Sequence, residues 1–236
     1  MIQPIFENNQ QNLEHFKKAI SISRFGTYLM HSQQDDMMAV RLYHWNAQLS
    51  QSLYLYLHGW EICLRNKLNA FLAWKYNTQE WAFNDRCLRQ FPAKDRAKVE
   101  ETKLRQQQAR KTKNVTTAAI VADLSAGIWV SLISAHTEVP FGMRGRPGDN
   151  LYRIFPNAKN ITRKEYWSMC DDILALRNRV AHYEPVLHLD LEARFKDMQT
   201  IVGAICPTSR SFFDTACEFD KVFKARPVKA PAVVAA

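Results

Sequence analysis

Between Asp35 and Phe71 the chain carries apolar side chains at steps of three and four residues. The series runs through Met38, Leu42, Trp45, Leu49, Leu53, Leu57, Trp60, Leu64 and Leu68. This spacing places the apolar side chains on one face of an α-helix. The pattern predicts a long amphipathic stretch, either one bent helix or two helices end to end, because Gly59 inside the run is a tolerable interruption.

Further helices are predicted along most of the chain from apolar periodicity and from capping residues. They cover residues 6–20, 25–31 after a cap at 21–24, 116–135 with Thr116 or Thr117 as N-cap, 163–182, 187–206 and 209–223. The charged stretch 92–113 has only a thin apolar stripe, so we expect an exposed helix or an ordered arm there. Residues 140–160, with several Gly, Pro, Asn and Asp, form the one clear loop region.

Glycine is scarce in this sequence, with only 7 in 236 residues. Folds of the α/β class use glycine in phosphate-binding loops and tight turns, and neither GxGxxG nor GxxxxGK[ST] occurs here. Because no convincing strand pattern occurs either, the sequence predicts an all-α fold with little or no sheet. We expect a single domain over residues 1–225 and a disordered tail over 226–236, which has little to pack.

The cysteines and the apolar runs exclude several classes of protein. The 5 cysteines are odd in number, widely spaced and never form a CxxC pair, so neither a disulfide framework nor a zinc site is expected, and a reducing cytosol fits better. The N-terminus lacks a basic flank followed by an apolar run, and no stretch reaches the roughly 18 apolar residues of a membrane span. We therefore expect a cytoplasmic protein without a membrane partner.

The formal net charge of +9 is concentrated in two segments. Residues 86–113 hold ten Lys and Arg against three acids, residues 141–166 hold six against two, and the remainder is slightly acidic. Such patches attract a phosphate backbone through counterion release without reading base sequence. The alternative is that both segments are ordinary solvated surfaces.

The segment 176–185, LRNRVAHYEP, places Arg, Asn and His at the end of a predicted helix. Asn178 and His182 are four residues apart and share a face, whereas Arg177 and His182 lie about 140° apart around an ideal helix. A long Arg side chain, or a last turn loosened before Pro185, would let both reach one ligand. The alternative is a purely structural helix end, where a His favours the negative end of the helix dipole.

The pattern RNxxxH at 177–182 resembles the signature of the HEPN superfamily. More specifically, the chain resembles the Abi-like (abortive-infection, AbiD/AbiF type) proteins. That family combines LRNRxAHxEP with an earlier Leu-Tyr-x-Trp-Asn helix and a Glu-x3-Arg-Asn element, which here are residues 42–46 and 61–66. Residues 121–129, VADLSAGIW, are similar to the family's ELSFGxW segment and depart from it at two positions. The motifs keep their order over residues 21–190.

The resemblance implies a HEPN-type helical bundle with additional helices that dimerises and cleaves RNA without a metal or cofactor. It implies a toxin-like effector of abortive infection and phage defence, restrained by an antitoxin (protein or RNA) or by an infection signal. The implied catalytic residues are Arg177, which neutralises the phosphate, Asn178, which orients the phosphate or the imidazole, and His182, which moves a proton. The expected product of this endoribonuclease ends in a 2′,3′-cyclic phosphate.

The resemblance also suggests residues that support the site and bind RNA. The supporting residues are Glu61, Arg65, Asn66, Arg179 and Tyr183. Glu61 and Arg65 form either a pair beside the site or a plain i,i+4 ion pair, and Arg179 and Tyr183 are rim contacts. The RNA-binding surface is expected to comprise Arg96, Lys98, Lys103, Arg105, Arg110, Lys111, Lys113, Arg144 and Arg146.

Two other functions fit the same residues. One is a non-catalytic RNA-binding module that keeps the helical bundle and the basic segments. The other is a structural subunit of a defence or toxin–antitoxin complex, in which the 177–182 motif is only a helix end. The RNA-binding module should bind RNA and the structural subunit should not. Neither of the two should cleave RNA, whereas a ribonuclease should.

Overall fold

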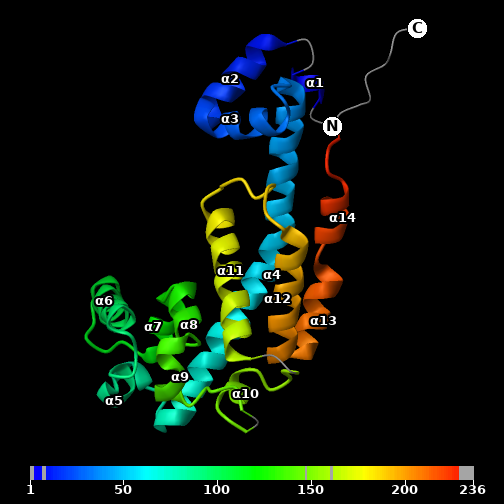
Figure 1. The fold of residues 1–236 in the computed structure, drawn as a ribbon. Coiled ribbons are helices and arrows are strands. Elements are labelled where there is room, and N and C mark those ends of the chain that lie inside the picture. Colours follow the sequence, from blue (N-terminus) through cyan, green and yellow to red (C-terminus); the bar gives the residue numbers. More distant parts are fainter. Residues whose placement is uncertain (1–2, 7–8, 147, 160–161, 229–236) are drawn as a thin grey trace. The chain divides into compact units, whose positions relative to one another are not determined.

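The computed structural model describes residues 3–6, 9–146, 148–159 and 162–228, and among these it contains helices and no strand (Figure 1). The all-α fold class predicted from the sequence is therefore confirmed. Most of the predicted disordered tail, residues 229–236, lies outside the described residues.

The helices are, in chain order, α1 (Gln3–Phe6), α2 (Gln10–Ile20), α3 (Ile22–His31), α4 (Asp36–Tyr76), the 3-10 helix η1 (Trp81–Phe83), α5 (Asp85–Leu88), α6 (Ala93–Arg110), α7 (Thr117–Asp123), α8 (Ala126–Ser131), α9 (Ala135–Phe141), α10 (Leu151–Ile154), α11 (Arg163–Ala181), α12 (Leu191–Ile205), α13 (Pro207–Ala216) and α14 (Phe219–Lys224).

The chain divides into two compact units. The first unit comprises Met1–Tyr54, Arg179–Leu189 and Cys217–Ala236, and the second comprises Leu55–Asn178 and Asp190–Ala216. Each unit therefore combines segments that are distant in the sequence. A single domain over residues 1–225 stays a prediction.

The apolar repeat from Asp35 to Phe71 belongs to one helix, α4, which is 41 residues long. The Asp35 carboxylate caps its start by accepting the Met38 N–H at 2.9 Å. A left-handed residue, Asn77 (φ 51°), follows its end. Every member of the predicted stripe from Leu42 to Phe71 is buried, so the periodicity identified the buried face correctly.

Aromatic side chains form the core of the first unit. Tyr43 on α4 makes edge contacts with Phe16 on α2 and with Tyr28 on α3, with ring centroids 5.4 and 5.2 Å apart. The Trp45 indole donates to the Val222 carbonyl at 2.8 Å and so connects α14 to α4. The cap predicted at 21–24 is confirmed, because the Ser21 hydroxyl accepts the Arg24 N–H.

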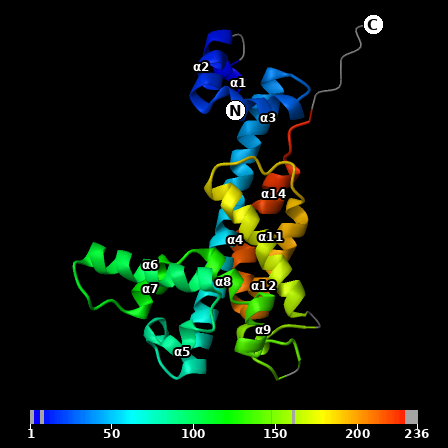
Figure 2. The same cartoon turned by 60° about the vertical axis from the view of Figure 1, so that its left-hand side comes forward.

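In the second unit, α11, α12 and α13 run alongside the later part of α4 (Figures 1 and 2). Tyr56 of α4 illustrates the packing, because it makes an edge contact with Phe195 of α12 (ring centroids 5.0 Å apart) and donates to Asp214 of α13 at 2.7 Å. The prediction of one helix over residues 209–223 is wrong, since α13 ends at Ala216 and α14 begins at Phe219.

The prediction of one helix over residues 116–135 is also wrong. Thr116 is the N-cap, as expected, but α7 ends at Asp123 because Leu124 and Ser125 have extended backbones (ψ 137° and 152°). Ile120, Leu124 and Ile128 are nevertheless all buried. The apolar spacing therefore continues across the break, which is why periodicity could not reveal it. The loop predicted over residues 140–160 likewise contains a short helix, α10.

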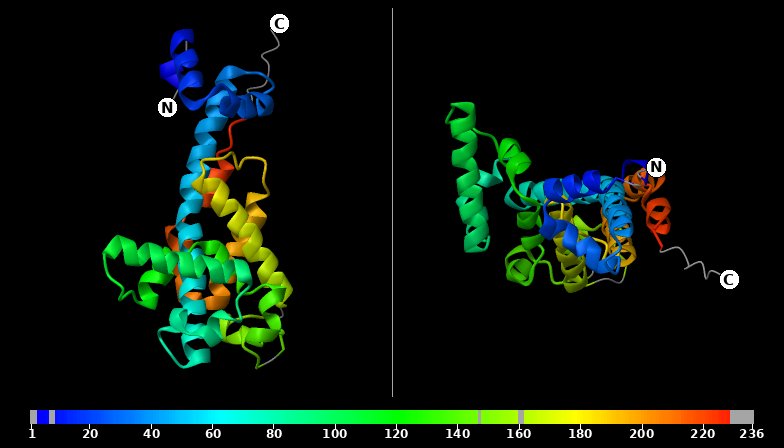
Figure 3. Two further views of the ribbon diagram at one scale, coloured as in Figure 1. Left: turned by 90° about the vertical axis from the view of Figure 1, so that its left-hand side faces the viewer. Right: turned by 90° about the horizontal axis from the view of Figure 1, so that it is seen from above.

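The charged stretch 92–113 forms a helix, α6, which lies against α7 at one edge of the second unit (Figure 3). Its buried face is formed by Asp95, Val99 and Thr102, spaced four and three residues apart. The Asp95 carboxylate accepts a hydrogen bond from the Ser131 hydroxyl of the α8 segment. This polar contact helps to hold α6 on the unit, together with the buried Val99 and Thr102 side chains.

Candidate functional site

A polar cluster in the second unit brings together three of the predicted site residues. Arg177, in the last turns of α11, donates from Nε to Glu61 Oε2 of α4 at 3.1 Å. Its Nη1 lies 3.5 Å from the Asn178 side-chain oxygen. The Arg177 and Glu61 side chains are 37% and 22% exposed, so the pair lies at the surface but is partly shielded from water.

This cluster corrects the expected partner of Glu61. Glu61 pairs with Arg177 rather than with Arg65, whose Nε donates instead to the side-chain oxygen of Asn66 at 3.4 Å. The i,i+4 ion pair considered from the sequence is therefore wrong. Glu61 is a contact of Arg177, and its role in supporting a catalytic site stays a prediction.

The geometry leaves Arg177 able to bind an anion. A guanidinium carries five N–H donors in a planar fork that matches carboxylate and phosphate oxygens. The Glu61 and Asn178 contacts engage Nε and Nη1, which leaves the donors of Nη2 for a ligand. Glu61 also restricts the rotamers of Arg177, which lowers the entropy cost of binding.

The predicted residues that follow Asn178 belong to the first unit. The main chain turns at Tyr183, whose left-handed φ of 58° lets the Glu184 N–H reach the Arg179 carbonyl at 2.8 Å. His182 and Tyr183 are exposed, the latter at 79%. His182 is thus accessible to a ligand.

The Arg179 side chain makes several contacts with the turn that follows it. Its Nε and Nη2 both donate to the Pro185 carbonyl, at 3.2 and 3.0 Å, and its Nη1 lies 3.4 Å from the Glu184 carboxylate. These contacts hold the turn that carries His182. The donors of Arg179 therefore stabilise the turn, and the expected role of Arg179 as a rim contact of the site stays a prediction.

Asn46 also supports this turn, which was not deduced from the sequence. Its side-chain oxygen accepts the Val186 N–H at 2.7 Å, and both residues are buried. Asn46 is 6% exposed and follows Trp45 on the buried side of α4. A polar residue on a buried helix face was the available signal, because such groups are nearly always hydrogen-bonded.

We expect Asn46→Ala to lower the free energy of unfolding by about 1–3 kcal/mol, because it leaves the buried Val186 N–H unsatisfied. Urea denaturation measures this change. Gln48→Ala, at an exposed position on the same helix, is the control and should change the free energy by less than about 0.5 kcal/mol. Equal effects of the two substitutions would contradict the role of Asn46.

Two of the nine predicted RNA-binding residues form ion pairs within the protein. Lys103 donates to Glu100 at 2.7 Å and lies 5.0 Å from the Phe83 ring centroid. Arg105 donates to Asp123 at 2.9 Å, and hydrogen bonds from Arg105 and then Gln106 hold the pKa of the Asp123 carboxyl below its ordinary value. These two cations are less available to an external phosphate.

The other seven predicted cations are mostly open to solvent. Arg110 donates to the Gln106 side chain at 3.0 Å and is exposed, and Lys98 is half-buried. The remaining five are all exposed: Arg96, Lys111, Lys113, Arg144 and Arg146. The cationic surface of the second unit is therefore carried by α6, the residues that follow it, and the loop after α9.

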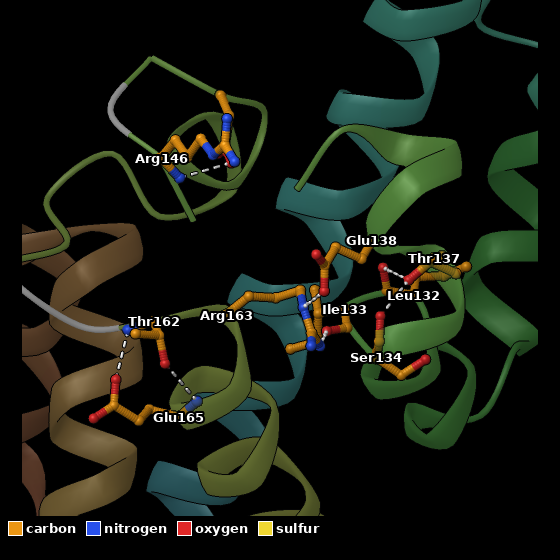
Figure 4. A network of polar contacts seen from close by, with 10 residues as sticks. Leu132, Ile133, Ser134, Thr137, Glu138, Arg146, Thr162, Arg163 and Glu165 are labelled. Atoms are coloured by element: carbon orange, nitrogen blue, oxygen red, sulfur yellow. Dashed lines mark hydrogen bonds and ion pairs between the residues drawn. The ribbon is translucent and has the colours of Figure 1, made fainter. Parts of the chain in front are cut away.

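The second basic segment, 141–166, directs part of its charge inward (Figure 4). Arg163 donates to the Glu138 carboxylate at 2.9 Å and to the Ile133 carbonyl at 3.1 Å, which attaches the start of α11 to the α8–α9 region. The Arg153 guanidinium lies 3.7 Å from the centroid of the Trp74 ring. Net charge along the sequence thus overstates the charge available to a ligand.

The part of the chain that the structure describes contains neither a metal-binding cluster nor a membrane-spanning helix. Within this part of the chain, no group of three or more His, Cys, Asp or Glu side chains is placed to hold a metal ion. None of its helices is both long and apolar enough to cross a membrane.

Comparison of the chain with protein-family models, with curated proteins and with solved structures found no match. The resemblance to Abi-like HEPN proteins therefore stays a prediction from sequence motifs.

Proposed function

We propose that this protein is a metal-independent endoribonuclease. The proposal is best supported by the contact of Glu61 with Arg177, two residues 116 positions apart in the sequence. They belong to two separate motifs, 61–66 and 177–182, that the resemblance to HEPN proteins assigns to one site. A contact between these motifs is expected of a ribonuclease site, whereas a plain helix end does not require it.

The proposed reaction uses the 2′-hydroxyl of the RNA as its nucleophile. His182 takes the proton from this hydroxyl, or returns one to the leaving 5′-oxygen, because imidazole exchanges protons near neutral pH. Arg177 neutralises the charge that grows on the pentacoordinate phosphorus, and Asn178 orients the phosphate. The O2′–P bond forms as the P–O5′ bond breaks, which gives a 2′,3′-cyclic phosphate and a 5′-hydroxyl.

In this proposal the protein is a toxin-like effector of phage defence in the cytoplasm. Two copies form a dimer and each contributes its Arg177 and His182 to a composite site. An antitoxin, made of protein or RNA, restrains the activity in uninfected cells. The exposed cations near α6 and in the loop after α9 position the RNA.

The direct test is RNA cleavage by the purified full chain in excess EDTA. We expect cleavage that is unaffected by the chelator, with fragments that mass spectrometry identifies as ending in 2′,3′-cyclic phosphate. Fragments with a 3′-hydroxyl, or activity only after divalent cations are added back, would contradict the proposal. RNA binding without cleavage would favour the non-catalytic RNA-binding module.

The proposed RNA surface predicts a specific salt dependence. Arg96→Ala and Lys113→Ala should each reduce the slope of log K against log salt by about 0.7, the value for one lost single-strand phosphate contact. Filter binding at several salt concentrations measures this slope. Lys196→Ala is the matched control, because Lys196 is exposed on α12 outside the proposed surface. A similar change for Lys196→Ala would mean that binding follows total charge and not this surface.

A further inference from the structure

In the second unit, α13 packs closely and antiparallel against α4. Tyr56 donates to Asp214 at 2.7 Å. One turn along α4, a Cβ on Gly59 would lie 2.5 Å from the ring of Phe213, so a larger residue there would have to displace this ring. From the first contact to the second, the residue number rises along α4 and falls along α13. The two helices are therefore antiparallel, and these contacts set their register.

The same register brings two cysteines together at the start of α13. Cys63 is one turn beyond Gly59 on α4, and Ser209 is one turn before Phe213 on α13, so the antiparallel packing brings Cys63 toward Ser209. Ser209 also influences the pKa of the Cys63 thiol. The Ser209 N–H also donates to Cys206 Sγ at 3.4 Å. Both cysteines are half-buried and neither is oxidised. Cys63 on α4 and Cys206 at the start of α13 thus both lie beside Ser209.

The two thiols have different electrostatic surroundings. Hydrogen bonds from the Ser209 side chain and backbone lower the pKa of Cys206, which directly precedes the first turn of α13, and the charge of Lys67 acts in the same direction. Burial raises the pKa of Cys63. Cys206 is therefore the more nucleophilic partner near neutral pH, and Cys63 is placed to react second.

We propose that Cys63 and Cys206 form a redox site that hydrogen peroxide converts into a reversible disulfide between α4 and the start of α13. The Cys206 thiolate attacks one peroxide oxygen, the O–O bond breaks, and the released hydroxide leaves as water after taking up a proton. The resulting sulfenic acid is attacked by the Cys63 sulfur, which forms the S–S bond and releases a second water. Two thiols are oxidised and one peroxide is reduced.

The remaining cysteines of the second unit contrast with this pair. Cys87 and Cys170 are buried, and burial raises the pKa of each thiol to about 12. Such thiols are protonated and screened from peroxide. Peroxide should therefore oxidise Cys63 and Cys206 in preference to Cys87 and Cys170.

The test is to treat the full chain with hydrogen peroxide, block the remaining thiols and digest the protein without reduction. Mass spectrometry is expected to find the peptides of Cys63 and Cys206 cross-linked with the loss of two hydrogens, and dithiothreitol should separate them. In Cys63→Ser the cross-link should be lost and dimedone should label Cys206 as a persistent sulfenic acid. In Cys206→Ser both the cross-link and the dimedone label should be lost.

Cys217→Ser is the matched control, because Cys217 is also half-buried and its thiol donates to the Ser52 carbonyl. This variant should keep the 63–206 cross-link. The same treatment in urea should give mixed pairings, which shows that the fold selects the pair. Absence of the cross-link from the folded wild type, or dimedone labelling of Cys63 in preference to Cys206, would overturn the proposal.

Discussion

Replacing His182 by alanine is expected to lower the rate of RNA cleavage by about 10²- to 10⁴-fold, the usual contribution of a general acid or base. His182 is exposed, so the substitution should leave the free energy of unfolding nearly unchanged. Arg177→Ala should lower the rate by about 10²- to 10³-fold, because it removes charge stabilisation of the transition state. Single-turnover cleavage of a labelled RNA in EDTA measures both rates.

Matched variants separate catalysis from general effects of charge and fold. His188→Ala removes an exposed histidine six residues further on, and Arg194→Ala removes an arginine that is paired with Asp172 and Asp197 on another part of the second unit. Both variants should keep the wild-type rate within about threefold, a difference of roughly 0.7 kcal/mol in the barrier. If His182→Ala and Arg177→Ala cleave RNA as fast as these controls, the ribonuclease proposal fails.

The largest expected effect on stability is that of Trp81→Ala, which should lower the free energy of unfolding by about 3–5 kcal/mol. Trp81 in η1 is fully buried. Its indole donates to the Asn69 side chain at 2.8 Å, and its ring lies 5.9 Å from that of Phe91 and 6.4 Å from that of Trp129. The substitution leaves a large cavity and an unpaired amide at the centre of this cluster.

Trp74→Ala provides the control for this measurement. Trp74 is 51% exposed, and its ring contacts the guanidinium of Arg153. Losing such a contact at the surface should cost only about 0.5–1 kcal/mol. Urea denaturation of both variants tests the difference, and similar losses would mean that Trp81 is not central to the core.

Patterns of neighbouring residues correctly predicted the buried face of α4 and two helix N-caps. The stripe along α4 and the caps at Ser21 and Thr116 are as expected, because helical periodicity and N-capping depend on residues within a turn or two of each other. The break between α7 and α8 was missed for a related reason. Leu124 keeps its buried position although its backbone is extended, so the spacing of apolar residues is the same with and without the break.

For the site, the sequence identified Arg177, Asn178 and His182 as candidates but not their contacts. Glu61 pairs with Arg177 and not with Arg65, and Arg179 holds the turn that carries His182. Asn46 supports the same turn from α4. Each of these contacts depends on which helix face meets which neighbour, and residue spacing within one helix does not contain that information.

The sequence by itself thus determined the fold class, the long helix α4 and its buried face, since these follow from the alternation of apolar and polar residues along the chain. Only the tertiary structure decided which cationic side chains remain available to bind a ligand. Lys103, Arg105 and Arg163 are used in internal ion pairs, and the register of α13 on α4 places Cys63 and Cys206 beside Ser209. The physical reason is that ion pairs and thiol contacts act over a few ångströms, and such distances between remote segments are set by helix packing.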